Sequence, residues 1–122
     1  MVGTGGFLGS VARYGLSGLV QSLSRSVSFP YGTLAVNLTG CLAVGFLSQL
    51  AEARGAFSGE TRIFLIAGFL GGFTTFSAFA NETMNMTREG RPAIAFGNVA
   101  LSVGLGLACV WLGRATAFRL WR

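Results

Sequence analysis

The sequence contains no lysine, no aspartate and no histidine, so its charged side chains are nine arginines and four glutamates. Charged residues make up 11% of the 122 residues, against about 25% in an ordinary soluble protein. So little charge argues against a soluble surface. Without histidine or aspartate the chain also offers no nucleophile paired with a base, so an enzyme is the function class that the sequence favours least.

Cysteine is scarce too, and Cys41 and Cys109 both fall in long apolar runs, where we interpret them as small apolar side chains and not as a disulfide. No positive charge precedes Arg13, so the first apolar run lacks the start of a cleavable signal peptide, and we expect it to stay in the protein. The net charge of +5 does not indicate a nucleic-acid partner, because the arginines gather at the ends of apolar runs and not along one face.

Long runs without charge decide the fold class, since about 20 apolar residues of helix cross a hydrocarbon core. The three charge-free runs are Ser26 to Ala51, Ile63 to Asn81 and Pro92 to Gly113. A fourth apolar stretch, residues 1–24, carries Arg13 at its centre. We therefore predict an all-α membrane protein with one domain, residues 1–122. Its four transmembrane helices are expected at about residues 3–23, 33–50, 63–86 and 92–113.

The third of these helices contains the run GGFTTFSAF, residues 71–79. Two glycines and two β-branched threonines weaken regular helix there. We predict that this helix is broken near its centre, at membrane depth. If the chain is helical after the break, Phe76 and Phe79 are three residues apart and face the same way.

Polar residues recur inside the other predicted spans. Thr33 and Asn37 are four residues apart in the second, as are Asn98 and Ser102 in the fourth, so each pair lies on one helix face. Asn37 either bonds a neighbouring helix or lines a pore. Arg13 would cost about 2.5 to 3.5 kcal/mol at the bilayer centre, so it faces a cavity or a partner, or else reaches the interface.

Arginines are divided almost evenly between the two sides of the predicted membrane domain. With four spans, five lie on the side of both termini and three on the other. The five are Arg54, Arg62, Arg114, Arg119 and Arg122, and the three are Arg25, Arg88 and Arg91. So weak a bias permits insertion in both orientations. Four short helices can hardly enclose a polar pathway alone, so we expect an antiparallel homodimer.

Four motifs in order resemble those of the CrcB or Fluc fluoride channels of microbial membranes, over nearly the full length. The motifs are Gly5-Gly6-x-x-Gly9 with Arg13-Tyr14, then Tyr31-Gly32-Thr33-Leu34-x-Val36-Asn37-x-x-Gly40, then Gly68-Phe69-x-Gly71-Gly72-x-Thr74-Thr75-Phe76-Ser77-x-Phe79, and Glu82-Thr83. The resemblance implies an antiparallel, dual-topology homodimer in the cytoplasmic (inner) membrane. It also implies passive export of fluoride, which lowers cytoplasmic fluoride.

The resemblance further implies roles for individual residues. Phe76 and Phe79 would line the fluoride pathway, together with six polar residues: Arg13, Thr33, Asn37, Ser77, Asn98 and Ser102. The backbone carbonyls of Gly71 and Thr74 would bind a structural sodium ion at the dimer interface. The family often has a tyrosine where Asn98 stands, and hydroxyl residues where Ala80 and Gly106 stand.

Two other functions stay open on the sequence alone. A small dual-topology, proton-coupled multidrug exporter is the main alternative, but it needs a titratable group deep in its cavity, and Glu82 is the only candidate here. The second is a non-transporting membrane subunit whose polar stripes only join helices.

Overall fold

The computed structural model describes residues 1–25, 29–55 and 57–120, and this part of the chain is helical without any strand. Its elements are α1 (Val2–Ser24), α2 (Tyr31–Arg54), α3 (Gly59–Arg62), a π-helical segment (Ile63–Leu70), α4 (Gly71–Phe73), α5 (Phe76–Arg88) and α6 (Pro92–Leu120). Three helical stretches are long and apolar enough to cross a membrane: Tyr31–Glu52, Gly59–Arg88 and Pro92–Leu120. The prediction of an all-α membrane protein is therefore confirmed.

Helix α1 is 23 residues long, but it is not among the helices that are apolar enough to cross a membrane by their mean hydropathy. Arg13 at its centre and a high content of glycine and serine lower its hydropathy. Its length nevertheless corresponds to about 34 Å of helix at 1.5 Å per residue, more than the hydrocarbon thickness of about 30 Å.

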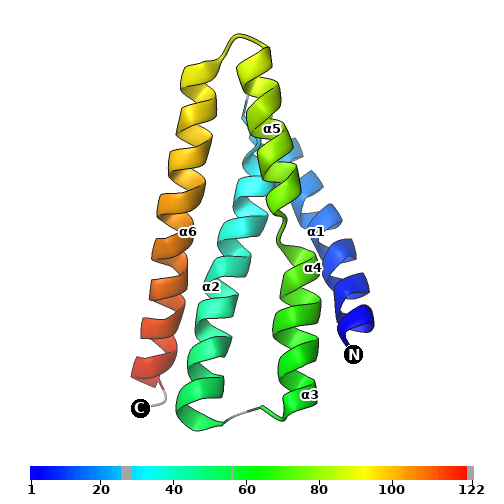
Figure 1. Ribbon diagram of the computed structural model, residues 1–122, viewed down its shortest axis with the longest axis vertical. Helices are drawn as coiled ribbons and strands as arrows, with labels where there is room; N and C mark the ends of the chain where they lie inside the picture. The colour runs from blue at the N-terminus through cyan, green and yellow to red at the C-terminus, as the bar shows by residue number, and fades with distance from the viewer. Residues whose placement is uncertain (26–28, 56, 121–122) are drawn as a thin grey trace.

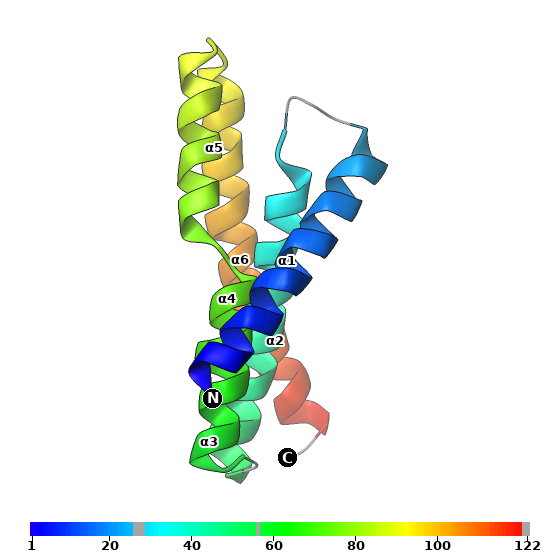
Figure 2. The ribbon, with the colours of Figure 1, turned by 90° about the vertical axis from the view of Figure 1, so that its right-hand side faces the viewer.

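The helices pack as a narrow bundle around α2, with α6 on one flank and α1 with α4 on the other (Figure 1). The N-terminus, the α2–α3 connection and the end of α6 lie toward one end, and the α5–α6 turn lies at the other (Figures 1 and 2). Figure 2 shows α5 and α6 diverging from α1 at that second end. A cavity lies between α1, α2 and α5 at this end.

Helix ends differ from the predicted ones in two places. Helix α2 continues to Arg54 and α3 begins at Gly59, so the connection between the second and third spans is much shorter than the predicted helices at 33–50 and 63–86 imply. Helix α6 runs past Gly113 to Leu120. A Cβ on Gly113 would overlap the backbone of Leu42 in α2, so this glycine permits close packing and does not end the helix.

Helical geometry in the third span is interrupted at two residues. Thr74 (φ −85°, ψ 157°) and Thr75 (φ −147°, ψ 118°) are extended, between α4 and α5. Gly71 is helical, with φ −62° and ψ −40°, so the interruption begins later than the sequence pattern indicated. Thr75 caps α5 because its Oγ1 accepts a hydrogen bond from the Ala78 N–H, at 3.2 Å.

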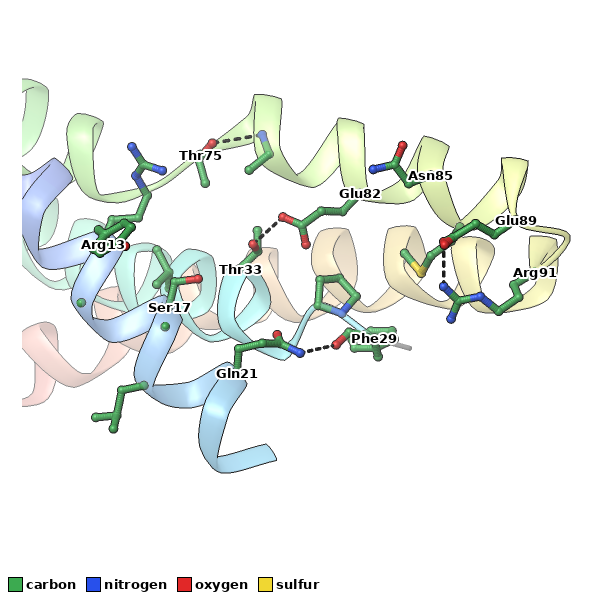
Figure 3. A pocket seen from close by; sticks show the side chains of 18 residues that line it. Arg13, Ser17, Gln21, Phe29, Thr33, Thr75, Glu82, Asn85, Glu89 and Arg91 are labelled. Atoms are coloured by element: carbon green, nitrogen blue, oxygen red, sulfur yellow. Dashed lines mark hydrogen bonds and ion pairs between the residues drawn. The ribbon is translucent and has the colours of Figure 1, made fainter. Parts of the chain in front are cut away.

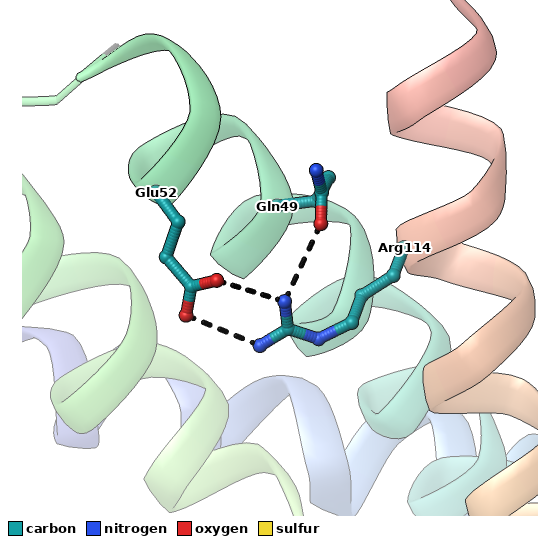
Figure 4. Close-up of polar contacts among 3 residues, drawn as sticks. All are labelled: Gln49, Glu52 and Arg114. Atoms are coloured by element: carbon teal, nitrogen blue, oxygen red, sulfur yellow. Dashed lines mark hydrogen bonds and ion pairs between the residues drawn. The ribbon is translucent and has the colours of Figure 1, made fainter.

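A polar contact ties the end of α2 to α6 (Figure 4). The two terminal nitrogens of Arg114 donate to the two carboxylate oxygens of Glu52, at 3.0 and 3.3 Å, and one also donates to Gln49, at 3.4 Å. The carboxylate is largely exposed, so this contact orients the helix ends more than it stabilises them.

Candidate functional site

A cavity of about 760 Å³ lies between α1, the start of α2, and α5 (Figure 3). Helix α1 supplies Arg13, Ser17 and Gln21, which follow one another at intervals of four and so share one helix face. Opposite them, the Thr33 Oγ1 donates to Glu82 Oε1 at 2.6 Å. The cavity therefore has polar side chains on two facing sides, with the cationic Arg13 at the end nearest the interruption.

A second cavity, of about 390 Å³, is lined by α2, the α4–α5 region and α6. Phe76 and Phe79 line it with their ring centroids 5.6 Å apart and the ring planes tilted by 54°. Asn37 and Ser102 add polar groups from the neighbouring helices. Thr75 lines both cavities, so the interruption separates two hollows on either side of the third span.

Asn37 binds the interruption through both ends of its side-chain amide. Its Nδ2 donates to the Thr75 carbonyl at 3.0 Å, and its Oδ1 accepts from the Thr75 N–H at 2.8 Å. It also lines the second cavity. The interhelical bond that the sequence left open for Asn37 is therefore present, and its role in a pore stays a prediction.

Arg13 contacts the same region from α1. Its Nε donates to the Gly72 carbonyl at 3.1 Å, and its half-buried side chain lines the first cavity. The guanidinium thus faces both a cavity and a backbone partner. Its positive charge therefore lies in the first cavity, beside the interruption.

The structure does not bring all of the predicted pathway residues together. Asn98 is 2% exposed and donates through Nδ2 to the Thr83 Oγ1 at 2.9 Å, so it lies in the α5–α6 contact and lines neither of the two cavities. Ser77 is exposed on α5, with its Oγ 3.4 Å from the Thr75 Oγ1. Thr33, in turn, lies in the first cavity and Ser102 in the second.

The backbone around the interruption is suited to bind a cation. In a continuous helix the Gly71 carbonyl would accept from the Thr75 N–H, and the Thr74 carbonyl from the Ala78 N–H. Here these two donors bond to Asn37 Oδ1 and Thr75 Oγ1 instead. Gly71 and Thr74 both line the second cavity. Carbonyls released from a helix in this way are typical ligands of Na⁺ in membrane proteins.

The sequence prediction missed Ser17 and Gln21, which line the first cavity. The spacing of Ser17 and Gln21 from Arg13 would have marked them as one polar face, because residues four apart share a face. Thr75 was predicted to lie in the break, but its role as the N-cap of α5 was not predicted. A hydroxyl residue directly before the start of a helix is the signal that could have shown it.

Fold and site together define a small multi-pass membrane protein with polar and aromatic-lined cavities on both sides of an interrupted helix. The profile of the family described as CrcB-like protein, Camphor Resistance (CrcB), matches residues 1–114. The chain belongs to this family.

Relatives of the chain carry a functional name. The "Fluoride-specific ion channel FluC" of Methylobacillus flagellatus is 46% identical over 113 residues, which cover 93% of this chain and 88% of the relative. The protein of the same name from Desulforapulum autotrophicum is 48% identical over 108 residues, 88% of this chain and 86% of the relative. That of Nitratidesulfovibrio vulgaris is 46% identical over 120 residues, 95% and 93% of the two chains. These relatives are ion channels of bacteria and not enzymes.

Proposed function

We propose that the protein is a fluoride channel that passively exports fluoride across the cytoplasmic membrane. The observation that carries the proposal is the second cavity, where Phe76 and Phe79 lie beside Asn37 and Ser102 at the helix interruption. The names of its relatives, which align over most of the chain, support fluoride as the ion.

The aromatic pair suits a small anion that must be bound weakly. Aromatic rings have a positive edge, which can replace part of the hydration shell of an anion. A cationic side chain in direct contact with fluoride would hold it too firmly for release, and conduction needs binding that is favourable but weak. Arg13 lies outside this cavity, so its charge draws anions toward the interruption without trapping them inside.

We further propose that α1 crosses the membrane with the other three spans, and that two chains form an antiparallel dual-topology dimer. Phe76 is 78% exposed in the single chain although it lines the second cavity, so its other side needs a cover. On α1, Phe7 is 68% and Tyr14 84% exposed, and both border a shallow hollow. A second copy would cover these surfaces, and the weak arginine bias permits its inverted insertion.

The dimer is expected to survive extraction in mild detergent. Light scattering that separates protein from detergent mass should give twice the chain mass of 12.7 kDa. In a variant whose Cys41 and Cys109 are replaced by alanine, a cysteine introduced at Thr87, exposed in the last turn of α5, should be labelled by an impermeant reagent both in intact cells and in inside-out membrane vesicles. Labelling from one side only would contradict dual topology.

The proposed sodium ion is a structural cofactor at the dimer interface, held by the Gly71 and Thr74 carbonyls. Both carbonyls lack their regular helical donors and line one cavity, which supports this assignment. A hard cation bound there would stabilise these carbonyls, which otherwise lack hydrogen-bond donors inside the membrane.

Fluoride efflux from liposomes tests the proposed function. Purified protein should release fluoride, measured with an ion-selective electrode, but not chloride under the same gradient. The flux should persist without a proton gradient, which separates a passive channel from a proton-coupled exporter. If no small ion crosses at all, the non-transporting subunit becomes the better account.

A further inference from the structure

The interruption between α4 and α5 is held by side chains from other helices. Asn37 on α2 bonds both the N–H and the carbonyl of Thr75, in the way that an adjacent backbone strand would. Arg13 on α1 bonds the carbonyl of Gly72.

These bonds matter because Thr75 is extended in a segment that would otherwise continue as helix. An unpaired backbone N–H or carbonyl in hydrocarbon costs several kcal/mol. Without Asn37, the Thr75 N–H would regain its bond to the Gly71 carbonyl if the chain rewound into helix. The side chain of Asn37 therefore competes directly with the bond that would close the Gly71 carbonyl off from a ligand.

We propose that Asn37 is a positioning residue for the cation site, which it creates by holding Thr75 extended so that the Gly71 and Thr74 carbonyls are available to sodium. The inference rests on the proposed sodium site. It gives Asn37 a role that differs from donating hydrogen bonds to the permeating anion. Arg13 assists, because its bond to Gly72 fixes the residue between the two cation ligands on the α4 side.

Replacing Asn37 tests this role through sodium-dependent thermal stability, which does not require transport. The Asn37→Ser variant loses both bonds to Thr75, and we expect the sodium concentration for half-maximal stabilisation to rise about 10-fold, the equivalent of one to two lost hydrogen bonds. Melting is followed in detergent, with sodium chloride titrated against N-methylglucamine chloride at constant ionic strength. The matched control is Thr39→Ala, because Thr39 lies on the same helix, is exposed, and bonds only its own helix at Ala35.

A second variant keeps the test decisive if Asn37→Ser does not fold. Asn37→Gln keeps the neutral amide on a side chain one methylene longer, so it can restore the bonds to Thr75 only in part, and its sodium midpoint should lie between those of the wild type and Asn37→Ser. Equal loss of melting temperature with and without sodium, at an unchanged midpoint, would refute the positioning role. If the wild-type protein conducts fluoride but gains no stability from sodium, this inference and the sodium site fail while the proposed function stands.

Discussion

Replacing Phe76 and Phe79 together by isoleucine is expected to reduce fluoride efflux about 100-fold, because losing about 1.4 kcal/mol of stabilisation at each ring slows a process tenfold per ring. Isoleucine keeps an apolar side chain of similar bulk but has no positive edge to face the anion. The two rings line the same cavity, so neither has an aromatic substitute when both are changed. Electrode recordings of efflux from liposomes with equal protein content measure the effect.

The control for this double variant is Phe96→Ile with Phe118→Ile. Both of these rings lie on α6, are 74% and 54% exposed, and line neither cavity. Their replacement should leave efflux within about twofold of the wild type, since surface changes away from special features are usually small. Undiminished fluoride flux through Phe76→Ile/Phe79→Ile would show that the anion takes another path.

The residue pattern was sufficient to predict the helical class and the faces of the helices. The length of a charge-free run predicts a transmembrane span, because hydrocarbon excludes charge. A spacing of four residues predicts that Thr33 and Asn37 share one helix face, and that Asn98 and Ser102 share another. What the pattern could not predict is the partner of each polar side chain. Asn37 bonds Thr75, 38 residues away, and Asn98 bonds Thr83. Such pairs depend on how helices pack, and local sequence does not encode that.

The same distinction explains the position of the interruption. The run from Gly71 to Thr75 contains several residues that weaken helix, and local preference alone does not choose among them. The contact with Asn37 selects Thr75, while Gly71 remains in regular helix. Eight residues before it adopt π-helical geometry, which sequence patterns do not reveal either. A wide helix followed by an extended pair is typical of functional sites in membrane helices.

The close approach of α1 to the third span should be highly sensitive to added bulk. A Cβ on Gly9 would overlap the Phe69 carbonyl oxygen and lie 2.9 Å from the Phe73 nitrogen. These are backbone atoms, which cannot rotate away, so Gly9→Ala must push the two helices apart. We expect a loss of about 1–3 kcal/mol from overpacking, which exceeds the gain of about 0.5–1 kcal/mol that alanine normally brings to a helix. Thermal melting in detergent measures the difference.

The matched control is Gly15→Ala on the same helix, where a Cβ meets nothing within 4 Å. It should keep or raise the melting temperature, because only the helix preference of alanine acts there. Displacing α1 at Gly9 also moves Arg13, one turn further along, away from the Gly72 carbonyl that it bonds. Gly9→Ala should therefore weaken stabilisation by sodium as well as the fold, whereas Gly15→Ala should leave the sodium midpoint unchanged. Equal melting temperatures of the two variants would contradict the close approach of Gly9 to the backbone of Phe69 and Phe73.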